Sequence, residues 1–234
     1  MSLDQLIERL PTGAVSTHPG ELAGRSRDWW ALAMLREVRG DPPVKPAAVV
    51  FPSSTEEVSI VLRWASETGT VVVPRGAGSG VVGGAEAIKR GIVLDTTRMA
   101  GVLSVDPTSM TASVQAGLRG DRLEQALAGQ GLTLGHYPQS LAISTVGGWI
   151  AATSAGQASA GYGGIEDLLL GLTVVLADGT VVKVPAHARS AAGPSLRHLF
   201  IGSEGTLGVV TEAVLSLSRL PSTYQWDAYK PASF

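Results

Sequence analysis

The chain contains no cysteine. This absence excludes disulfide bonds, thiolate nucleophiles and metal sites built from cysteine. The four histidines, His18, His136, His187 and His198, are too scattered in the sequence to indicate a metal cluster, so we expect no metal. A chain without cysteine also suits the cytoplasm, and we expect a cytoplasmic protein.

Excess charge of one sign and long apolar runs are missing too. The 18 basic and 20 acidic side chains are mixed along the chain and give a net charge of -2, so nothing attracts nucleic acid or an anionic membrane surface. No apolar run approaches the roughly 20 residues of a membrane-spanning helix, and the N-terminus lacks the pattern of a signal peptide. We expect a soluble globular protein whose partner is a small-molecule substrate, with no nucleic acid and no membrane span.

The chain has enough apolar sequence to bury a core, because 44% of its 234 residues are hydrophobic. Residues 2–10 carry apolar side chains at helical spacing and predict a short helix that ends at Pro11. Residues 11–46 are rich in proline, glycine and charge. We expect them to form an irregular arm whose only large apolar anchor is the pair Trp29 and Trp30.

A strand, a helix and two strands follow this arm. Residues 48–52 predict a short strand, residues 54–57 form a capping box that opens a helix, and Gly69 is placed to end it. Residues 71–73 and 92–95 predict the next strands. Strand, helix and strand in this order predict a parallel unit.

The pattern changes near Asp106, where we expect a second subdomain to begin. Asp178-Gly179 lies between two apolar runs and is a strong hairpin signal, so the second sheet should be antiparallel. The further elements are predicted as strands at 102–105, 110–115, 172–177, 180–184 and 209–217 and as a helix within 118–131. The expected fold class is α+β, with two α/β subdomains, a small parallel-sheet one and a larger antiparallel-sheet one.

The most informative stretch, residues 76–84, has five glycines in nine positions directly after the strand at 71–73. We call it the glycine loop. Glycines let consecutive backbone N–H groups turn toward one anion, so the loop predicts a phosphate cradle at a strand end. A glycine-rich turn with no ligand is the simpler alternative.

Two familiar phosphate loops fit it poorly. An NTPase loop needs Lys followed by Ser or Thr, whereas Ala85-Glu86 follows here. Gly78 to Gly83 matches G-x-G-x-x-G, and Asp95 could serve as the ribose-binding acid of a nicotinamide-dependent enzyme. The chain between Gly80 and the next strand is, however, too short for a full crossover helix.

Two later segments also point to a ligand. Small residues dominate 144–156, and Ser144 or Thr145 can cap a helix whose N-terminus faces the negative groups of a ligand. Tight helix packing is an equally good reading of these small residues. Residues 201–212 place another glycine-rich turn before a strand.

Together these blocks resemble the FAD-binding PCMH-type domain of the vanillyl-alcohol-oxidase-like FAD-linked oxidases and dehydrogenases, over residues 45–217. Residues 74–80 look like the pyrophosphate loop of that family, residues 144–148 like its isoalloxazine and pyrophosphate segment, and residues 202–210 like its third flavin contact. Residues 136–140 and 162–167 look closest to the alkyldihydroxyacetonephosphate-synthase-like and glycolate-oxidase-subunit-like branch.

The resemblance implies a set of cofactor-binding residues taken from these blocks. They are Pro74, Arg75, Gly76, Ala77, Gly78, Ser79, Gly80, Gln139, Ser140, Ser144, Thr145, Gly147, Gly148, Ala152, Thr153, Ser154, Ala155, Gly156, Glu204, Gly208, Val209 and Val210. FAD should be bound non-covalently, because Ser79 stands at about the usual place of the linking histidine and the chain lacks cysteine. His136 and Tyr137 either face the flavin or belong to a packed loop.

Three residues depart from the family pattern. Ala77 stands where glycine is usual, which requires a negative φ at that position. Gly164 stands where the synthase-like branch usually has Asn, and Thr153 where it often has Arg. The last two departures weigh against the ether-lipid substrate of that branch.

The resemblance also implies how the chain is organised. We expect an arm and helix at 1–44, FAD-binding subdomains at 45–106 and 107–220, and at 221–234 the start of a C-terminal cap domain that is missing from this chain. The family's cap supplies the substrate pocket and most catalytic side chains, so no catalytic residue is predicted here. A separate cap subunit or a homo-oligomer is a possible partner.

The expected function is that of the FAD-binding domain of an oxidoreductase acting on a hydroxylated small molecule such as a 2-hydroxy acid. The alternatives are a non-enzymatic flavin-binding subunit or fragment, a synthase-like flavoenzyme acting on a glycerone-phosphate ester, and a nicotinamide-dependent enzyme.

Overall fold

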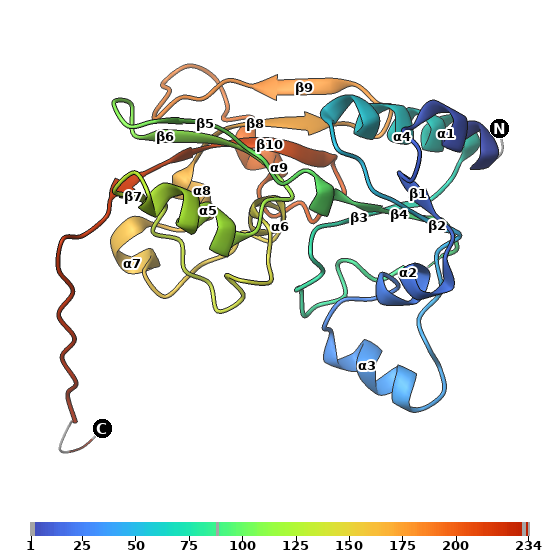
Figure 1. The fold of residues 1–234 in the computed structure, drawn as a ribbon, viewed down its shortest axis with the longest axis horizontal. Coiled ribbons are helices and arrows are strands. Elements are labelled where there is room, and N and C mark those ends of the chain that lie inside the picture. The colour runs from blue at the N-terminus through green and yellow to red at the C-terminus, as the bar shows by residue number, and fades with distance from the viewer. Residues whose placement is uncertain (1–2, 88, 231–232, 234) are drawn as a thin grey trace.

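The computed structural model describes residues 3–87, 89–230 and 233. It contains two main sheets, with helices packed on their faces (Figure 1). Ser2 of the predicted first helix and residues 231–232 and 234 of the predicted cap segment lie outside the described residues.

The first sheet has four strands in the order β1-β2-β4-β3. Strands β2 (Ala48–Val50), β4 (Ile92–Asp95) and β3 (Val72–Arg75) are parallel, as predicted, and β1 (Val15–Ser16) adds an antiparallel edge. Helix α4 (Thr55–Thr68) connects β2 to β3. Because β4 lies between β2 and β3, the glycine loop leads from an edge strand to an inner one.

Helix α4 begins and ends where the sequence predicts. The Ser54 hydroxyl accepts a hydrogen bond from the Glu57 N–H at 3.2 Å, and Gly69 ends the helix with a φ of 65°. The Glu57 carboxylate accepts from the N–H of Ser53 at 2.8 Å, one residue earlier than an ideal capping box requires. The apolar side chains Val58, Val61, Leu62 and Ala65 of this helix share one face and are buried.

The second sheet has five antiparallel strands in the order β5-β6-β10-β8-β9, which confirms the predicted antiparallel arrangement. Their bounds are β5 (Val102–Asp106), β6 (Thr111–Gln115), β8 (Leu169–Val175), β9 (Val181–Val184) and β10 (Val209–Ser216). Strands β8 and β9 form the predicted hairpin, with Gly179 at a φ of 84°. Because β5 pairs with β6, the two sheets divide before Val102, ahead of the expected boundary near Asp106.

Shorter elements complete the fold. They are α1 (Leu3–Arg9), α2 (Pro19–Gly24), α3 (Ala31–Val38), the 3-10 helix η1 (Thr96–Arg98), α5 (Gly120–Ala128), β7 (Leu132–Thr133), α6 (Val146–Ala151), α7 (Ser159–Tyr162), α8 (Ile165–Leu168), α9 (Arg197–Phe200) and β11 (Ser218–Arg219). Strand β7 pairs with β11 apart from the two main sheets.

The predicted irregular arm is wrong in two respects. Residues 11–46 contain β1, α2 and α3, and β1 pairs with β2 across 35 residues of chain, from Val15 to Val50. Pairing at that separation leaves no local pattern in so short a strand. Trp29 is 60% exposed and does not hold the arm, whereas Trp30 packs against Gly83.

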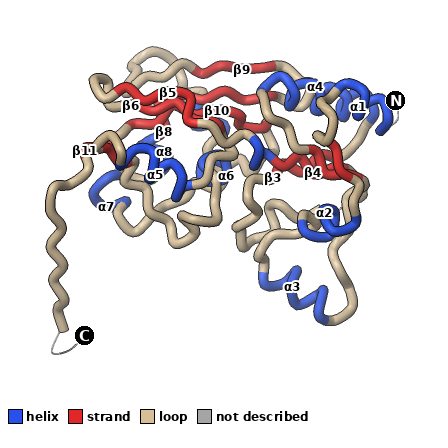
Figure 2. The backbone as a smooth tube through the Cα atoms, viewed as in Figure 1, coloured by secondary structure: helices blue, strands red, loops and turns tan. Residues whose placement is uncertain are grey.

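Two large hydrophobic cores and a small third cluster of Val49, Phe51 and Val93 hold the sheets together. One lies between the second sheet and helices α5, α6 and α8, and the other surrounds α1, α4 and the first sheet. Val175 and Val209 of the second sheet belong to the latter core, and the Thr55 hydroxyl donates to the Thr211 hydroxyl at 2.9 Å in its interior. The two halves are therefore packed directly on each other, and Figure 2 shows the backbone of α4 beside the strands of the second sheet.

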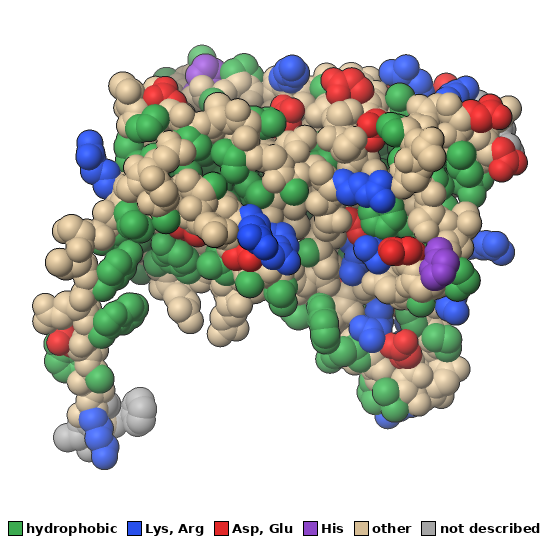
Figure 3. Space-filling model, viewed as in Figure 1, with side chains coloured by type: hydrophobic (Ala, Val, Ile, Leu, Met, Phe, Trp, Pro, Cys, Tyr) green, Lys and Arg blue, Asp and Glu red, His purple; other side chains and the backbone are tan. Residues whose placement is uncertain are grey.

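The surface carries basic and acidic side chains interspersed with apolar and polar ones over the face drawn in Figure 3. In the part of the chain that the structure covers, no helix combines the length and the apolar character needed to cross a membrane. After β11 the chain runs away from the body (Figure 1), with exposed side chains at Tyr224, Trp226 and Tyr229.

Close packing explains two of the small residues at 144–156. A Cβ on Gly147 would lie 2.8 Å from the Cβ of Ala116, and a Cβ on Gly156 would lie 2.6 Å from the backbone carbon of Tyr137. Neither space can hold a methyl group without a backbone shift. For these two glycines the packing interpretation therefore holds.

We predict that Leu94→Ala lowers the free energy of unfolding by about 2 to 5 kcal/mol, because it removes a fully buried side chain from the middle of the first sheet. Leu103→Ala, at a leucine that is 50% exposed, is the matched control and should change it by about 0.5 kcal/mol or less. Urea unfolding measures both, and equal losses would contradict the assigned core.

We also predict opposite effects for two glycine-to-alanine changes. Gly156→Ala should destabilise the fold by about 1 to 3 kcal/mol because its methyl group meets the backbone of Tyr137. Gly161→Ala in α7 meets nothing within 4 Å and should be neutral or stabilising by up to about 1 kcal/mol. Thermal unfolding of the two variants measures these changes in stability. A Gly156→Ala protein as stable as the parent would contradict the packing interpretation.

Candidate functional site

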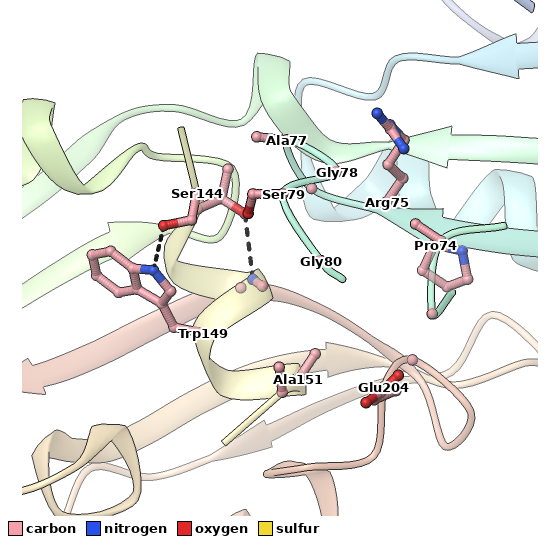
Figure 4. A pocket seen from close by; sticks show the side chains of 18 of the residues that line it. Pro74, Arg75, Ala77, Gly78, Ser79, Gly80, Ser144, Trp149, Ala151 and Glu204 are labelled. Atoms are coloured by element: carbon pink, nitrogen blue, oxygen red, sulfur yellow. Dashed lines mark hydrogen bonds between the residues drawn. The ribbon is translucent and has the colours of Figure 1, made fainter. Parts of the chain in front are cut away.

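A cleft opens where the carboxyl end of β3 faces α6 and the start of β10 (Figure 4). Three segments supply most of its lining: the end of β3 with the glycine loop, residues 140–154 around α6, and the turn at 203–210. These are the three blocks that the sequence singles out. Residues far apart in the chain therefore meet in one place.

The glycine loop needs its glycines for close contacts. Gly78 has a φ of 73°, and a Cβ there would overlap the guanidinium of Arg75. A Cβ on Gly76 would overlap the hydroxyl of Thr145, which begins α6. Ala77 is not among the residues with positive φ, so its methyl group is tolerated as predicted.

Four successive N–H groups of this loop carry the strongest indication of a ligand. Within the described residues, the N–H groups of Ala77, Gly78, Ser79 and Gly80 donate no hydrogen bond to the protein. All four residues line the cleft. Consecutive free N–H groups beside a cleft are suited to hold an anion such as a phosphate.

Arg75 supports the loop rather than reaching into the cleft. Its Nη1 donates to the carbonyl oxygen of Arg27 at 2.9 Å, and in Figure 4 the guanidinium points away from α6. Burial lowers the pKa of Arg75, and the charge of Asp95 opposes that shift. The arginine thus ties the loop to the N-terminal arm.

Asp95 does not serve as a ribose-binding acid. It is 2% exposed, its carboxylate accepts from Arg25 Nε at 3.1 Å and from the Thr97 N–H at 2.9 Å, and it does not line the cleft. The described residues between β3 and β4 also contain no helix. Both findings contradict the nicotinamide-dependent alternative.

Helix α6 begins as predicted, but its first N–H groups are already bonded. The Thr145 hydroxyl accepts from the Gly148 N–H at 3.3 Å. The N–H groups of Val146 and Gly147 donate to the carbonyl oxygens of Leu118 and Ala116 at 3.0 and 2.7 Å. The helix therefore offers the cleft small side chains rather than free donors.

The turn before β10 is fixed against α6 by backbone hydrogen bonds. The N–H groups of Gly202 and Glu204 donate to the carbonyl oxygens of Ile150 and Ala151, each at 3.0 Å. Glu204 and Thr153 both have a φ of 48°, an unusual backbone region for residues other than glycine. Such conformations gather at binding sites, where the surrounding contacts hold them.

Most of the predicted site residues come together in this cleft. Four of them do not line it: Gln139, Thr153, Ala155 and Gly156. The lining residues that the prediction missed are Asp28, Val82, Gly84, Ala85, Thr96, Trp149, Ala151, Ser203 and Gly205. Most of these are neighbours of predicted residues, whereas Asp28 comes from the arm, and no local pattern indicates it.

His136 is packed behind the cleft. It is fully buried, its Nε2 lies 2.7 Å from the Ser154 hydroxyl, and its ring meets Trp149 edge-on at 4.8 Å. Burial lowers its pKa, with the charge of Glu166 opposing the shift, so the ring is neutral near pH 7. The Tyr137 hydroxyl bonds to Thr133 at 2.7 Å, outside the cleft. The packed-loop reading therefore holds for both residues.

Relatives of known classification match the chain over much of its length. The chain is 40% identical over 187 residues to alkyldihydroxyacetonephosphate synthase of Dictyostelium discoideum, which covers 79% of this chain and 30% of that protein. It is 40% identical over 179 residues to the glycolate oxidase subunit GlcD of Bacillus subtilis (strain 168), which covers 76% of this chain and 38% of that protein. The chain thus spans less than half the length of these relatives.

A solved structure of alkyldihydroxyacetonephosphate synthase matches the fold with a TM-score of 0.87 and 33% identity, over 94% of this chain and 44% of that one. This agreement confirms the expected α+β fold with its smaller, mainly parallel sheet and larger antiparallel sheet. The family described as FAD binding domain matches residues 46–185, which include the glycine loop and α6. The chain therefore belongs to the FAD-binding domain family of the FAD-linked oxidoreductases, and its cofactor is FAD.

Proposed function

We propose that this chain binds FAD non-covalently in the cleft and serves as the flavin domain of an oxidoreductase acting on a hydroxylated small molecule such as a 2-hydroxy acid. The observation that carries the proposal is the row of four unbonded N–H groups at residues 77–80. FAD, when bound, supplies the chemistry by accepting a hydride. The protein holds and orients it.

The polar groups and the small side chains that line the cleft suit the phosphates and the flat ring of FAD. The four N–H groups match the two phosphates of FAD, and the small side chains of Ala151, Ala152 and Ser154 leave room for a flat ring beside α6. Gln139, Thr153, Ala155 and Gly156 stay proposed cofactor residues that act from behind the lining. The turn at 203–210 completes the proposed site as its third wall.

Non-covalent binding follows from the side chains available. The chain has no cysteine, and His136 is buried and bonded to Ser154. Ser79 faces the cleft, but a serine hydroxyl is a weak nucleophile without an adjacent base. We therefore propose that FAD is released when the protein unfolds.

The groups that would bind and activate a substrate are missing from the described lining of the cleft. The ionisable residues that line the cleft are Asp28, Arg75 and Glu204, and the first two are engaged in hydrogen bonds within the protein. A pair of positioned acid and base groups, which hydroxyl oxidation needs, is missing from the described lining. We propose that a cap domain, beginning near residues 221–234, or a separate cap subunit supplies them, in a cytoplasmic enzyme that can be a homo-oligomer.

The similarity to GlcD favours a 2-hydroxy acid, because glycolate is the simplest member of that class. The similarity to alkyldihydroxyacetonephosphate synthase favours a glycerone-phosphate ester as the second candidate substrate. Thr153 and Gly164 stand where that branch usually has Arg and Asn, so we rank the 2-hydroxy acid first.

We predict that the purified chain carries FAD and that Gly78→Val loses it, with occupancy reduced at least about tenfold. The valine side chain overlaps the Arg75 guanidinium and cannot adopt the φ of 73° without strain, so the four N–H groups lose their alignment. The absorption spectrum of the protein measures occupancy, and circular dichroism checks that it folds.

Gly131→Val is the matched control, because Gly131 also has a positive φ, of 70°, but lies in open space away from the cleft. It should keep FAD. A folded Gly78→Val protein with stoichiometric FAD would refute the assignment of the cradle. Colour that stays in the protein pellet after acid precipitation would refute non-covalent binding.

We predict that the FAD-loaded chain alone is not reduced by glycolate or other 2-hydroxy acids at an enzyme-like rate, which means above about 1 per second. Dithionite, which needs no substrate pocket, should bleach the same sample and serves as the control. Anaerobic stopped-flow absorbance measures both reactions. Rapid bleaching by a 2-hydroxy acid would show that the acid and base groups lie in this chain after all.

A further inference from the structure

The N-terminal arm contacts one end of the glycine loop through the carboxylate of Asp28. Asp28 is 2% exposed and lines the cleft. Its Oδ1 accepts from the Trp30 N–H at 2.9 Å, and its Oδ2 accepts from the Gly83 N–H at 3.0 Å. The Asp28 carboxylate therefore lies inside the turn at 80–83, where it accepts from the Gly83 N–H.

Other contacts of the arm hold the same stretch. The Trp29 N–H donates to the Gly80 carbonyl oxygen at 2.8 Å, and the Ala87 N–H donates to the Ser26 carbonyl oxygen at 3.1 Å. The Trp30 ring lies 2.9 Å from where a Cβ of Gly83 would be. Because the described residues of this loop form no helix or strand, these contacts set its shape.

The N–H groups of this loop thus fall into two groups, one bonded within the protein and one not. The N–H of Gly83 is used by Asp28, whereas the N–H groups of residues 77–80 have no acceptor among the described residues. If the carboxylate were removed, the Gly83 N–H would lose its partner, which weakens the set of contacts that fixes the shape of the turn. The alignment of the neighbouring donors depends on that turn through Gly80, whose Cβ would lie 3.2 Å from Asp28 Oδ2.

We propose that Asp28 is the positioning residue of the cofactor site, which fixes the turn at 80–83 so that the N–H groups of residues 77–80 point together at the phosphates. This inference rests on the proposed FAD site. It goes beyond the matched family segment, because residues 46–185 do not include the arm. Asp28 acts through the loop and needs no contact with FAD.

The role depends on the geometry of acceptance more than on charge. Both carboxylate oxygens accept backbone N–H groups, so Asp28→Asn presents a donor to one of them and breaks that hydrogen bond. Asp28→Ala removes both acceptors. Formate is small enough to replace the lost carboxylate in Asp28→Ala, and it provides a test that a change in overall stability cannot imitate.

The experiment compares the parent protein with Asp28→Ala, Asp28→Asn and Asp106→Ala. Asp106 is the matched control, because its carboxylate also accepts two backbone N–H groups, from Thr108 at 2.8 Å and Ser109 at 3.1 Å, in a turn away from the cleft. Hydrogen exchange of the FAD-free proteins reports the loop directly, and titration with FAD gives the dissociation constant. Sodium formate is then added, with sodium chloride as the salt control.

We expect faster exchange at residues 77–87 in Asp28→Ala and an FAD dissociation constant raised about 10- to 100-fold, with a smaller rise in Asp28→Asn. Asp106→Ala should leave both quantities unchanged. Formate, but not chloride, should recover part of the FAD affinity of Asp28→Ala. If Asp28→Ala fails to fold, Asp28→Asn carries the same comparison.

Unchanged exchange and unchanged FAD affinity in both Asp28 variants would overturn the inference, as would a loss that Asp106→Ala matches. If the parent protein binds no FAD, the proposed function fails. The exchange measurement still decides in that case whether Asp28 fixes the loop.

Discussion

The site depends on the requirement that backbone N–H groups find acceptors. A folded chain bonds almost all of its buried N–H groups, and the N–H groups of residues 77–80, in a loop that is half-buried to exposed apart from the buried Gly78, bond to no described acceptor. Contacts on both sides of residues 77–80 hold this stretch: the Arg75 side chain donates to Arg27 in the arm, Gly76 packs closely against the Thr145 hydroxyl, and the Gly83 N–H donates to Asp28. These contacts hold the loop in a shape that leaves the four N–H groups without an acceptor in the described protein.

The same requirement explains why α6 and the turn before β10 contribute differently from the glycine loop. The first N–H groups of α6 are bonded to the strand end at residues 116–118, which fixes the helix against the second sheet. In the turn before β10, the N–H groups of Gly202 and Glu204 donate to carbonyl oxygens at the end of α6. Two of the three segments are therefore rigid walls with small side chains, and one carries the donors.

Local signals predicted the parts of the fold that are decided locally. Ser54 and Gly69 bound α4, Thr145 begins α6, and Asp178-Gly179 turns the β8-β9 hairpin, each through contacts within a few residues. The site blocks were predicted for the same reason, since a run of glycines is visible in the sequence itself. Resemblance to a family then placed three such blocks in one cleft.

The arm and the division between the sheets could not be predicted in this way. Strand β1 has two residues and pairs with β2, and β5 joins the second sheet although it precedes the turn at Asp106. Such pairings are decided by distant partners and leave no periodic pattern in short strands. Asp28 was missed because an isolated aspartate between arginine and tryptophan has no motif, and its role is visible only from its two bonded N–H groups.

The position of β4 between β2 and β3 also has a consequence for how the molecule folds. Strand β4 pairs with β2 on one side and with β3 on the other, so the completed first sheet requires the chain between β3 and β4, which includes the glycine loop, to close. Closing a loop has an entropic cost that is incurred before the long-range contacts are gained. The closed loop and the completed sheet are thus coupled, and a ligand that binds the closed loop also stabilises the sheet beneath it.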